Sequence, residues 1–151
     1  MKLRGFEKIS AYKDADIVLP VRKTETSAGY DICLAEAVEL APGQSVMAAT
    51  GLKAYMQPDE FLSIHIRSSM GIKKHLRLLN SVGIVDADYY NNPDNEGHIM
   101  IALENMGTET VRIAKGERVA QGIFTRYLTT DDDADTVKEK RSGGFGSTGE
   151  K

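Results

Sequence analysis

The chain carries short apolar runs, each followed within a few residues by Gly, Pro or Asn, and no long segment repeats its apolar residues at helical spacing. Alternation is clearest at residues 61–67, where Leu62, Ile64 and Ile66 fall on one face, and at residues 109–113. Counting every such run gives about ten strands. The pattern predicts an all-β sandwich or barrel.

The remaining runs predict where other strands lie. We expect strands at residues 28–35, 45–49, 52–56 and 118–128, and an edge strand at 17–21, where Pro20 would remove a ladder donor. Residues 68–71 break the run that ends at 67. The basic stretch 73–77 fits either a short helix or an irregular loop, and the sequence does not decide between them.

Residues 80–103 are predicted to form a β-hairpin with a long tip. One apolar run enters at Gly83, turn-forming residues fill 91–97, and a second apolar run occupies 98–103. Asp86, Asp88 and Tyr89 lie where the first strand ends, and the two carboxylates would share a strand face. Acids and an aromatic ring at the mouth of a hairpin indicate a candidate site for chemistry.

Composition narrows the class of protein. The 151 residues are 41% apolar with a net charge of −3, which suits one domain and argues against a nucleic-acid polymer as the main ligand. One cysteine, Cys33, excludes an intrachain disulfide framework and reads as a strand thiol rather than a nucleophile. No apolar run is long enough to span a membrane. No signal-peptide core is visible, and we expect a cytoplasmic location.

The C-terminal residues differ from the rest. We expect a β-barrel domain at 1–128, then an acidic linker and a glycine-rich arm of the same domain at 129–151. The acidic run 131–135 is interpreted as a solvated linker, because such a composition buries too little apolar surface to order itself. The arm is predicted to be flexible. Its glycines, with Arg141, Ser147 and Thr148, would suit a wrapped anion.

Five short motifs occur in order along the chain. They are Ser-Ala-Gly-Tyr-Asp-Ile at 27–32, Arg-Ser-Ser-Met-Gly at 67–71, the segment 80–89, Gly-Glu-Arg-Val-Ala-Gln at 116–121, and Gly-Gly-Phe-Gly-Ser-Thr-Gly at 143–149. Taken together, they resemble the trimeric dUTPase (dUTP diphosphatase) family. Each motif alone is weak, but five in the family's order cover most of the chain and are specific.

The resemblance implies a small β-barrel with jelly-roll character, assembled as a homotrimer with active sites shared between subunits. It implies hydrolysis of dUTP to dUMP and pyrophosphate, which limits uracil incorporation into DNA and supplies dUMP for dTMP synthesis. Mg²⁺ is expected as the cofactor, because three adjacent phosphates need charge neutralisation. The resemblance also implies that Asp31 contacts a metal-bound water or the neighbouring subunit.

The base, the sugar and the attacking water are assigned by the same resemblance. Asp86 would be the general base that activates water for attack at the α-phosphorus, since an aspartate is ionised at neutral pH; the alternative is a turn aspartate that caps backbone N–H groups. Tyr89 would lie on the deoxyribose and exclude a 2′-hydroxyl. Uracil would be bound by the following residues of the chain: Asn80, Gly83, Val85 and, stacking from the arm, Phe145.

Phosphate binding is assigned to two strand ends and the arm. The implied residues are Arg67, Ser68, Ser69, Gln121, Arg141, Gly146, Ser147 and Thr148. Arg141 departs from the family spacing, in which the arginine lies five residues before the phenylalanine, where this chain has Lys140. Either cation could reach a phosphate. Ser69 stands where glycine is common, and the tip at 90–97 is longer than usual, with no role assigned.

Two rival functions remain at this point. A dCTP deaminase shares the fold and an Arg-Ser-Ser motif, but deamination needs a glutamate at C4 of the base, whereas this chain has an aspartate in the hydrolase motif. A non-enzymatic nucleotide-binding trimer would not need the complete set of polar site residues. The three histidines, His65, His75 and His98, have no zinc-site spacing.

Overall fold

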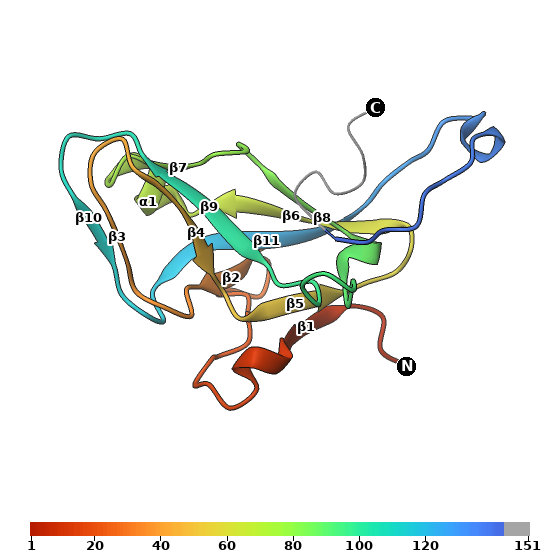
Figure 1. Ribbon diagram of the computed structural model, residues 1–151, viewed down its shortest axis with the longest axis horizontal. Helices are drawn as coiled ribbons and strands as arrows, with labels where there is room; N and C mark the ends of the chain where they lie inside the picture. The colour runs from red at the N-terminus through yellow and green to blue at the C-terminus, as the bar shows by residue number, and fades with distance from the viewer. Residues whose placement is uncertain (144–151) are drawn as a thin grey trace.

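A computed structural model describes residues 1–143, and Figure 1 shows them as a body of packed sheets. One sheet has four antiparallel strands in the order β2 (Tyr30–Cys33), β11 (Arg118–Arg126), β6 (Glu60–Ile66) and β8 (Gly83–Asp86). A second has three, in the order β4 (Ser45–Ala49), β9 (Met100–Asn105) and β7 (Leu76–Leu78). Two pairs complete the strands, β1 (Gly5–Lys8) with β5 (Leu52–Tyr55) and β3 (Val38–Leu40) with β10 (Val111–Ile113).

Helical structure within these residues is short. It comprises α1 (Ser68–Ile72) and three single 3₁₀ turns, η1 (Ser10–Tyr12), η2 (Ala87–Tyr89) and η3 (Asp133–Asp135). The all-β prediction is therefore confirmed, and residues 1–143 contain no helix with the length and apolarity that a membrane crossing requires.

The core follows from the alternation seen in the sequence. Leu62 and Ile64 of β6 point inward and are buried, and their partners across β11 are Phe124 and Gly122. Burying such a leucine side chain stabilises the fold by about 1.5–3 kcal/mol. Phe61 and His65 alternate with them on the outer face. The sheet therefore has one face in the core and one face free to carry polar side chains.

Two local predictions were wrong. Residues 17–21 form no strand, and only Arg22 makes a bridge, to Tyr30. The basic stretch 73–77 was expected to be a short helix or a loop, but its end belongs to strand β7, in which Leu76 and Leu78 are buried and Arg77 between them is exposed. Residues 68–71 break the preceding strand as predicted, and they do so as a helix, because the Arg67 carbonyl accepts from the N–H groups of Met70 and Gly71 while the Met70 side chain is buried in the core.

The hairpin prediction was also wrong, and this difference shapes the site. Strand β8 pairs with β6, with Leu62 opposite Val85, whereas β9 pairs with β4 and β7. The two predicted hairpin strands thus belong to different sheets and do not pair. Asp88 lies in the 3₁₀ turn η2, so Asp86 and Asp88 do not share a strand face. Apolar alternation specified each strand but not its partner, because both strands bury one face wherever they pair.

The last strand ends at Arg126, two residues earlier than expected. The chain beyond it runs outward through η3 and returns, so that residue 141 lies beside the end of β8 (Figure 1). The arm residues Gly144, Phe145, Gly146, Ser147 and Thr148 lie outside the described residues, as does the predicted flexibility of the arm.

Candidate active site

A cavity of about 350 Å³ opens between β8 and β9, the two strands that do not pair. Because β8 is an edge strand among residues 1–143, half of its backbone N–H and C=O groups have no strand partner. The cavity is lined by Asn80, Gly83, Val85, Asp86 and Tyr89, together with apolar side chains of β7 and β9. All the residues assigned to base, sugar and water in the described chain therefore meet in one pocket, which we call the base pocket.

Tyr89 forms a wall of the base pocket. Its side chain is 7% exposed, its hydroxyl donates to the His98 carbonyl at 2.6 Å, and the Asn95 side-chain amide donates to the same hydroxyl at 2.9 Å. Burial raises the pKa of Tyr89, against smaller lowering effects of the Asn95 hydrogen bond and the Arg141 charge. The ring is thus a neutral surface held at its polar end.

Asp86 lies at the mouth of this pocket with its carboxylate half in solvent. Arg141 donates from Nη2 to Asp86 Oδ2 and from Nε to Asp88 Oδ1, each at 2.6 Å, and its guanidinium carbon lies 6.0 Å from the Tyr89 ring centroid. Asp88 does not line the pocket. Arg141 therefore pairs with the carboxylate of its own chain in this structure, whereas Lys140 forms no hydrogen bond or ion pair with either acid.

A second cavity of about 340 Å³ lies near the other edge of the same sheet, and we call it the phosphate pocket. It collects four residues assigned to phosphate, Arg67, Ser68, Ser69 and Gln121, where β6 ends and α1 begins. The sequence did not assign several further lining residues, which are Lys23, Ser27, Gly29 and Arg118. Ser27 and Gly29 belong to the first motif, and a Cβ on Gly29 would collide with the Gln121 side chain.

Asp31 lies in the phosphate pocket, where Arg118 donates to Asp31 Oδ2 at 2.8 Å. This ion pair occupies one carboxylate oxygen. Residues 1–143 contain no group of three His, Cys, Asp or Glu side chains that could hold a metal ion. The described residues thus do not form a protein cage for Mg²⁺, and a triphosphate would have to supply most ligands of a bound ion.

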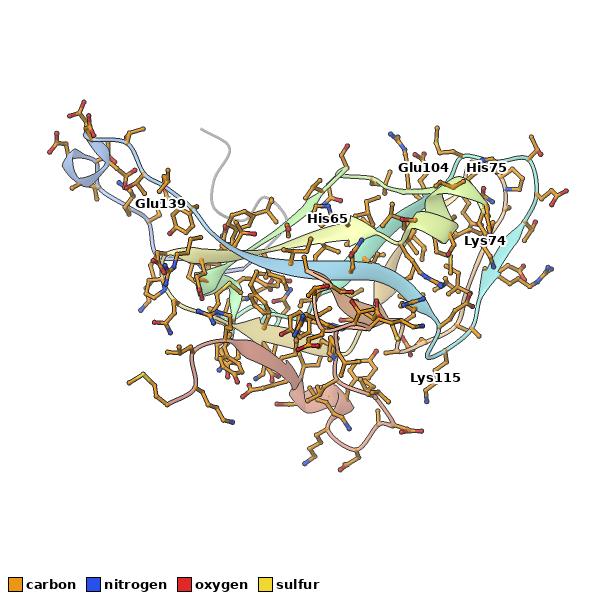
Figure 2. The ribbon with its side chains drawn as sticks, turned by 180° about the vertical axis from the view of Figure 1, so that it is seen from behind. His65, Lys74, His75, Glu104, Lys115 and Glu139 are labelled. Atoms are coloured by element: carbon orange, nitrogen blue, oxygen red, sulfur yellow. The ribbon has the colours of Figure 1, made fainter. Side chains whose placement is uncertain are left out.

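The histidines are dispersed. Figure 2 shows His65 near the middle of the sheet and His75, with Lys74 and Lys115, at the end of the molecule opposite Glu139. The ring of His98 accepts a hydrogen bond from the Gly51 N–H at 2.9 Å, and burial lowers its pKa. A neutral imidazole with a protein donor on Nε2 has a structural function.

The two pockets share no lining residue. Asp86 is in register with Phe61, and Gln121 is in register with His65, four residues further along β6. Four residues of strand and two strand spacings separate them by roughly 16 Å. One chain therefore does not bring Asp86 together with the four phosphate candidates of the phosphate pocket, whereas Arg141, a further phosphate candidate, lines the base pocket.

Comparison with known proteins identifies the class of this chain. A family model for dUTPase matches residues 15–149. The deoxyuridine 5′-triphosphate nucleotidohydrolase of Lactococcus lactis is 56% identical over 149 residues, covering 99% of each chain. That of Wolinella succinogenes is 33% identical over 135 residues, covering 87% of each. The crystal structure of dUTPase from Streptococcus mutans superposes with a TM-score of 0.79 at 50% identity, covering 84% of this chain and 98% of that one.

The chain belongs to the dUTPase family. Its fold and its activity, the hydrolysis of dUTP, follow from that membership. The family resemblance drawn from the five motifs is confirmed.

Proposed function

We propose that the chain hydrolyses dUTP to dUMP and pyrophosphate by attack of an Asp86-activated water on the α-phosphorus. The observation that supports this most is the base pocket, where an ionisable carboxylate, a buried aromatic wall and an unpaired strand edge converge. Asp86 is exposed enough to hold a water and close enough to the pocket to aim it at a bound nucleotide. Arg141 contacts Oδ2 of Asp86, which leaves Oδ1 for the water.

The strand edge suits uracil. Backbone N–H and C=O groups of Gly83 and Val85, with the Asn80 side chain, offer the alternating donors and acceptors that the pairing edge of uracil needs. Cytosine would leave a buried polar group unpaired, which costs roughly 1–3 kcal/mol. The Tyr89 ring would pack on the deoxyribose and leave no space for a 2′-hydroxyl. Phe145 of the arm would stack on the base.

The phosphate pocket suits the charge that develops as pyrophosphate leaves. Arg67 and Gln121, with the hydroxyls of Ser68 and Ser69, present donors on one rim, and such donors stabilise the transition state when aimed at the bridging oxygen. The arm is proposed to complete the phosphate site through Arg141, Gly146, Ser147 and Thr148. Mg²⁺ bound by the triphosphate would neutralise phosphate charge, and Asp31 is the residue proposed to hold one of its waters.

We propose a homotrimer with shared sites, and the strand register supports the sharing. A water held by Asp86 and a phosphate held by Gln121 must be neighbours, yet these residues lie roughly 16 Å apart in one chain. A second copy whose phosphate pocket faces the first copy's base pocket would bring them together, and a ring closed by three such heterologous contacts is a trimer. We place the enzyme in the cytoplasmic nucleotide pool, where it would keep uracil out of DNA and supply dUMP.

Pyrophosphate release from dUTP, UTP, dTTP and dCTP with Mg²⁺ tests the activity and its specificity. We expect turnover of dUTP to exceed that of the others by orders of magnitude, and chelation of the metal to abolish it. Comparable turnover of dTTP or UTP would refute the proposed reading of the base pocket. Ammonia release from dCTP would instead support a deaminase.

Mixing inactive variants tests the shared site. Asp86→Asn chains retain a phosphate pocket, and chains carrying Arg67→Ala and Gln121→Ala retain a base pocket. Denatured together and refolded, the two should regain activity in about a quarter of the sites, because random assembly pairs intact halves at that frequency. Activity no higher than that of the separate variants would contradict sharing between subunits.

A further inference from the structure

The hydroxyl of Tyr89 has a fixed pair of partners. It donates its one proton to the His98 carbonyl at 2.6 Å, so it accepts from the Asn95 amide at 2.9 Å. The other end of that amide, Asn95 Oδ1, accepts from Asn92 Nδ2 at 2.8 Å and from the Gly97 N–H at 3.0 Å. Two donors on Oδ1 leave only one orientation of the Asn95 side chain, with Nδ2 directed at Tyr89.

Asn92 fixes the same loop from within. It is 5% exposed, and its Nδ2 also donates to the Tyr89 backbone carbonyl at 2.7 Å. Its Oδ1 accepts from the backbone N–H groups of Asp94 and Asn95 at 3.0 and 3.1 Å. Every polar atom of this buried side chain is therefore used, and it joins Tyr89 to the turn that carries Asn95.

The loop is in turn anchored to the body of the protein. The Glu96 carboxylate accepts from the Ser10 N–H at 3.0 Å and from Lys53 at 2.7 Å. Gly97 has φ +90°, and a Cβ there would lie 2.7 Å from the Tyr89 carbonyl oxygen. Only glycine allows this approach, which presses the loop against the chain behind Tyr89.

We infer that residues 92–97 are the support that fixes the Tyr89 ring, and that Asn95 is a positioning residue for discrimination against a 2′-hydroxyl. The inference rests on the proposed role of Tyr89 at the deoxyribose. The Tyr89 ring excludes a hydroxyl only if it cannot move away from the sugar. A supporting group therefore has to hold the ring within about 0.5 Å of its position. The long tip, for which the sequence suggested no function, thereby becomes part of substrate selection.

Asn95→Asp removes the support with the least change of shape. The carboxylate still accepts from Asn92 and Gly97, but its second oxygen competes with His98 for the single Tyr89 proton instead of donating one. We expect KM for dUTP to rise and the selectivity for dUTP over UTP, as a ratio of kcat/KM, to fall, each about tenfold, while kcat for dUTP stays within about twofold. A purely structural residue would lower the melting temperature without changing the selectivity ratio.

Asn91→Gly is the matched control in the same loop. Asn91 has φ +57°, which glycine tolerates, and its side chain contacts Lys53 rather than Tyr89. We expect the wild-type selectivity ratio. In a Tyr89→Phe background, which lacks the hydroxyl, Asn95→Asp should cause no further loss of selectivity, because the two side chains act through one bond.

Tyr89→Ala separates this inference from the function on which it rests. If Tyr89→Ala lowers the selectivity for dUTP over UTP and Asn95→Asp does not, the positioning role is overturned and the role of Tyr89 stands. If Tyr89→Ala keeps the wild-type selectivity, both are overturned. A loss of selectivity in Asn95→Asp that persists undiminished in the Tyr89→Phe background also overturns the inference.

Discussion

Asp86→Asn removes a charge and a proton acceptor while keeping the size of the side chain. General-base catalysis contributes about 10²–10⁴ in rate, so kcat should fall by that factor, equivalent to about 3–5 kcal/mol in the barrier. The Arg141 ion pair is lost as well, but the Asp86 side chain is 53% exposed, and a pair so open to solvent contributes at most about 1 kcal/mol to stability. The catalytic loss therefore exceeds any loss of folding.

Asp88→Asn is the matched control for this prediction. Asp88 contacts the same arginine at the same 2.6 Å and is similarly exposed, yet it does not line the base pocket. Single-turnover pyrophosphate release separates the two variants, with binding measured on a non-hydrolysable dUTP analogue. We expect Asp88→Asn to keep its rate within a few-fold. Equal losses in both variants would show that the pair with Arg141 matters rather than a base, and full activity of Asp86→Asn would refute its assignment.

Three further predictions concern the rest of the site and the fold. Gly29→Ala should push the Gln121 side chain away, with little change in melting temperature. KM for dUTP should rise about tenfold, because that factor corresponds to the loss of one hydrogen bond to a charged group. An unchanged KM would exclude Gln121 from phosphate binding. A chain ending at Lys140 should lose turnover yet melt as the full chain does, and a large fall in melting temperature would make the arm structural. The hydrogen bonds from Arg4 hold the pKa of Glu60 below its usual value. Glu60 therefore stabilises the fold at pH values above its pKa in the unfolded chain, and this contribution is lost as the pH falls through its pKa in the folded protein. The difference in unfolding free energy between wild type and Glu60→Gln should shrink in acid, and a constant difference would contradict the pairing.

The sequence predicted the parts of the fold that depend on local periodicity. Strand β6 follows from the alternation of Leu62, Ile64 and Ile66, and the Gly and Pro residues between apolar runs marked the ends of most strands correctly. Strand β8 was found but assigned to the wrong partner, since pairing with β6 depends on contacts between residues far apart in the chain. The error concealed the base pocket, which exists because β8 and β9 do not pair.

The candidate site was likewise predicted only in part. The motifs supplied Asp86, Tyr89, Arg67 and Gln121 by residue type and order, but only the register shows that they form two pockets in one chain. The supporting residues could not be found from periodicity. Asn95 looked like an ordinary turn former, and its hydrogen bond to Tyr89 depends on the folded path of the loop.

Arg141 adds a point that neither motif nor register predicted. In this structure it pairs with Asp86 and Asp88 of its own chain, whereas the proposed function needs an arm cation at the phosphates. The same side chain cannot do both at once. Under the proposed function, substrate binding would replace the carboxylate contacts of Arg141 by a phosphate contact.

Hydrolysis of dUTP in heavy-oxygen (¹⁸O) water tests the central claim most directly, because the label marks the phosphorus that the water attacks. With Asp86 aiming water at the α-phosphorus, mass spectrometry should find the label in dUMP and none in pyrophosphate. Label in pyrophosphate would place the attack at the β-phosphorus and contradict the account.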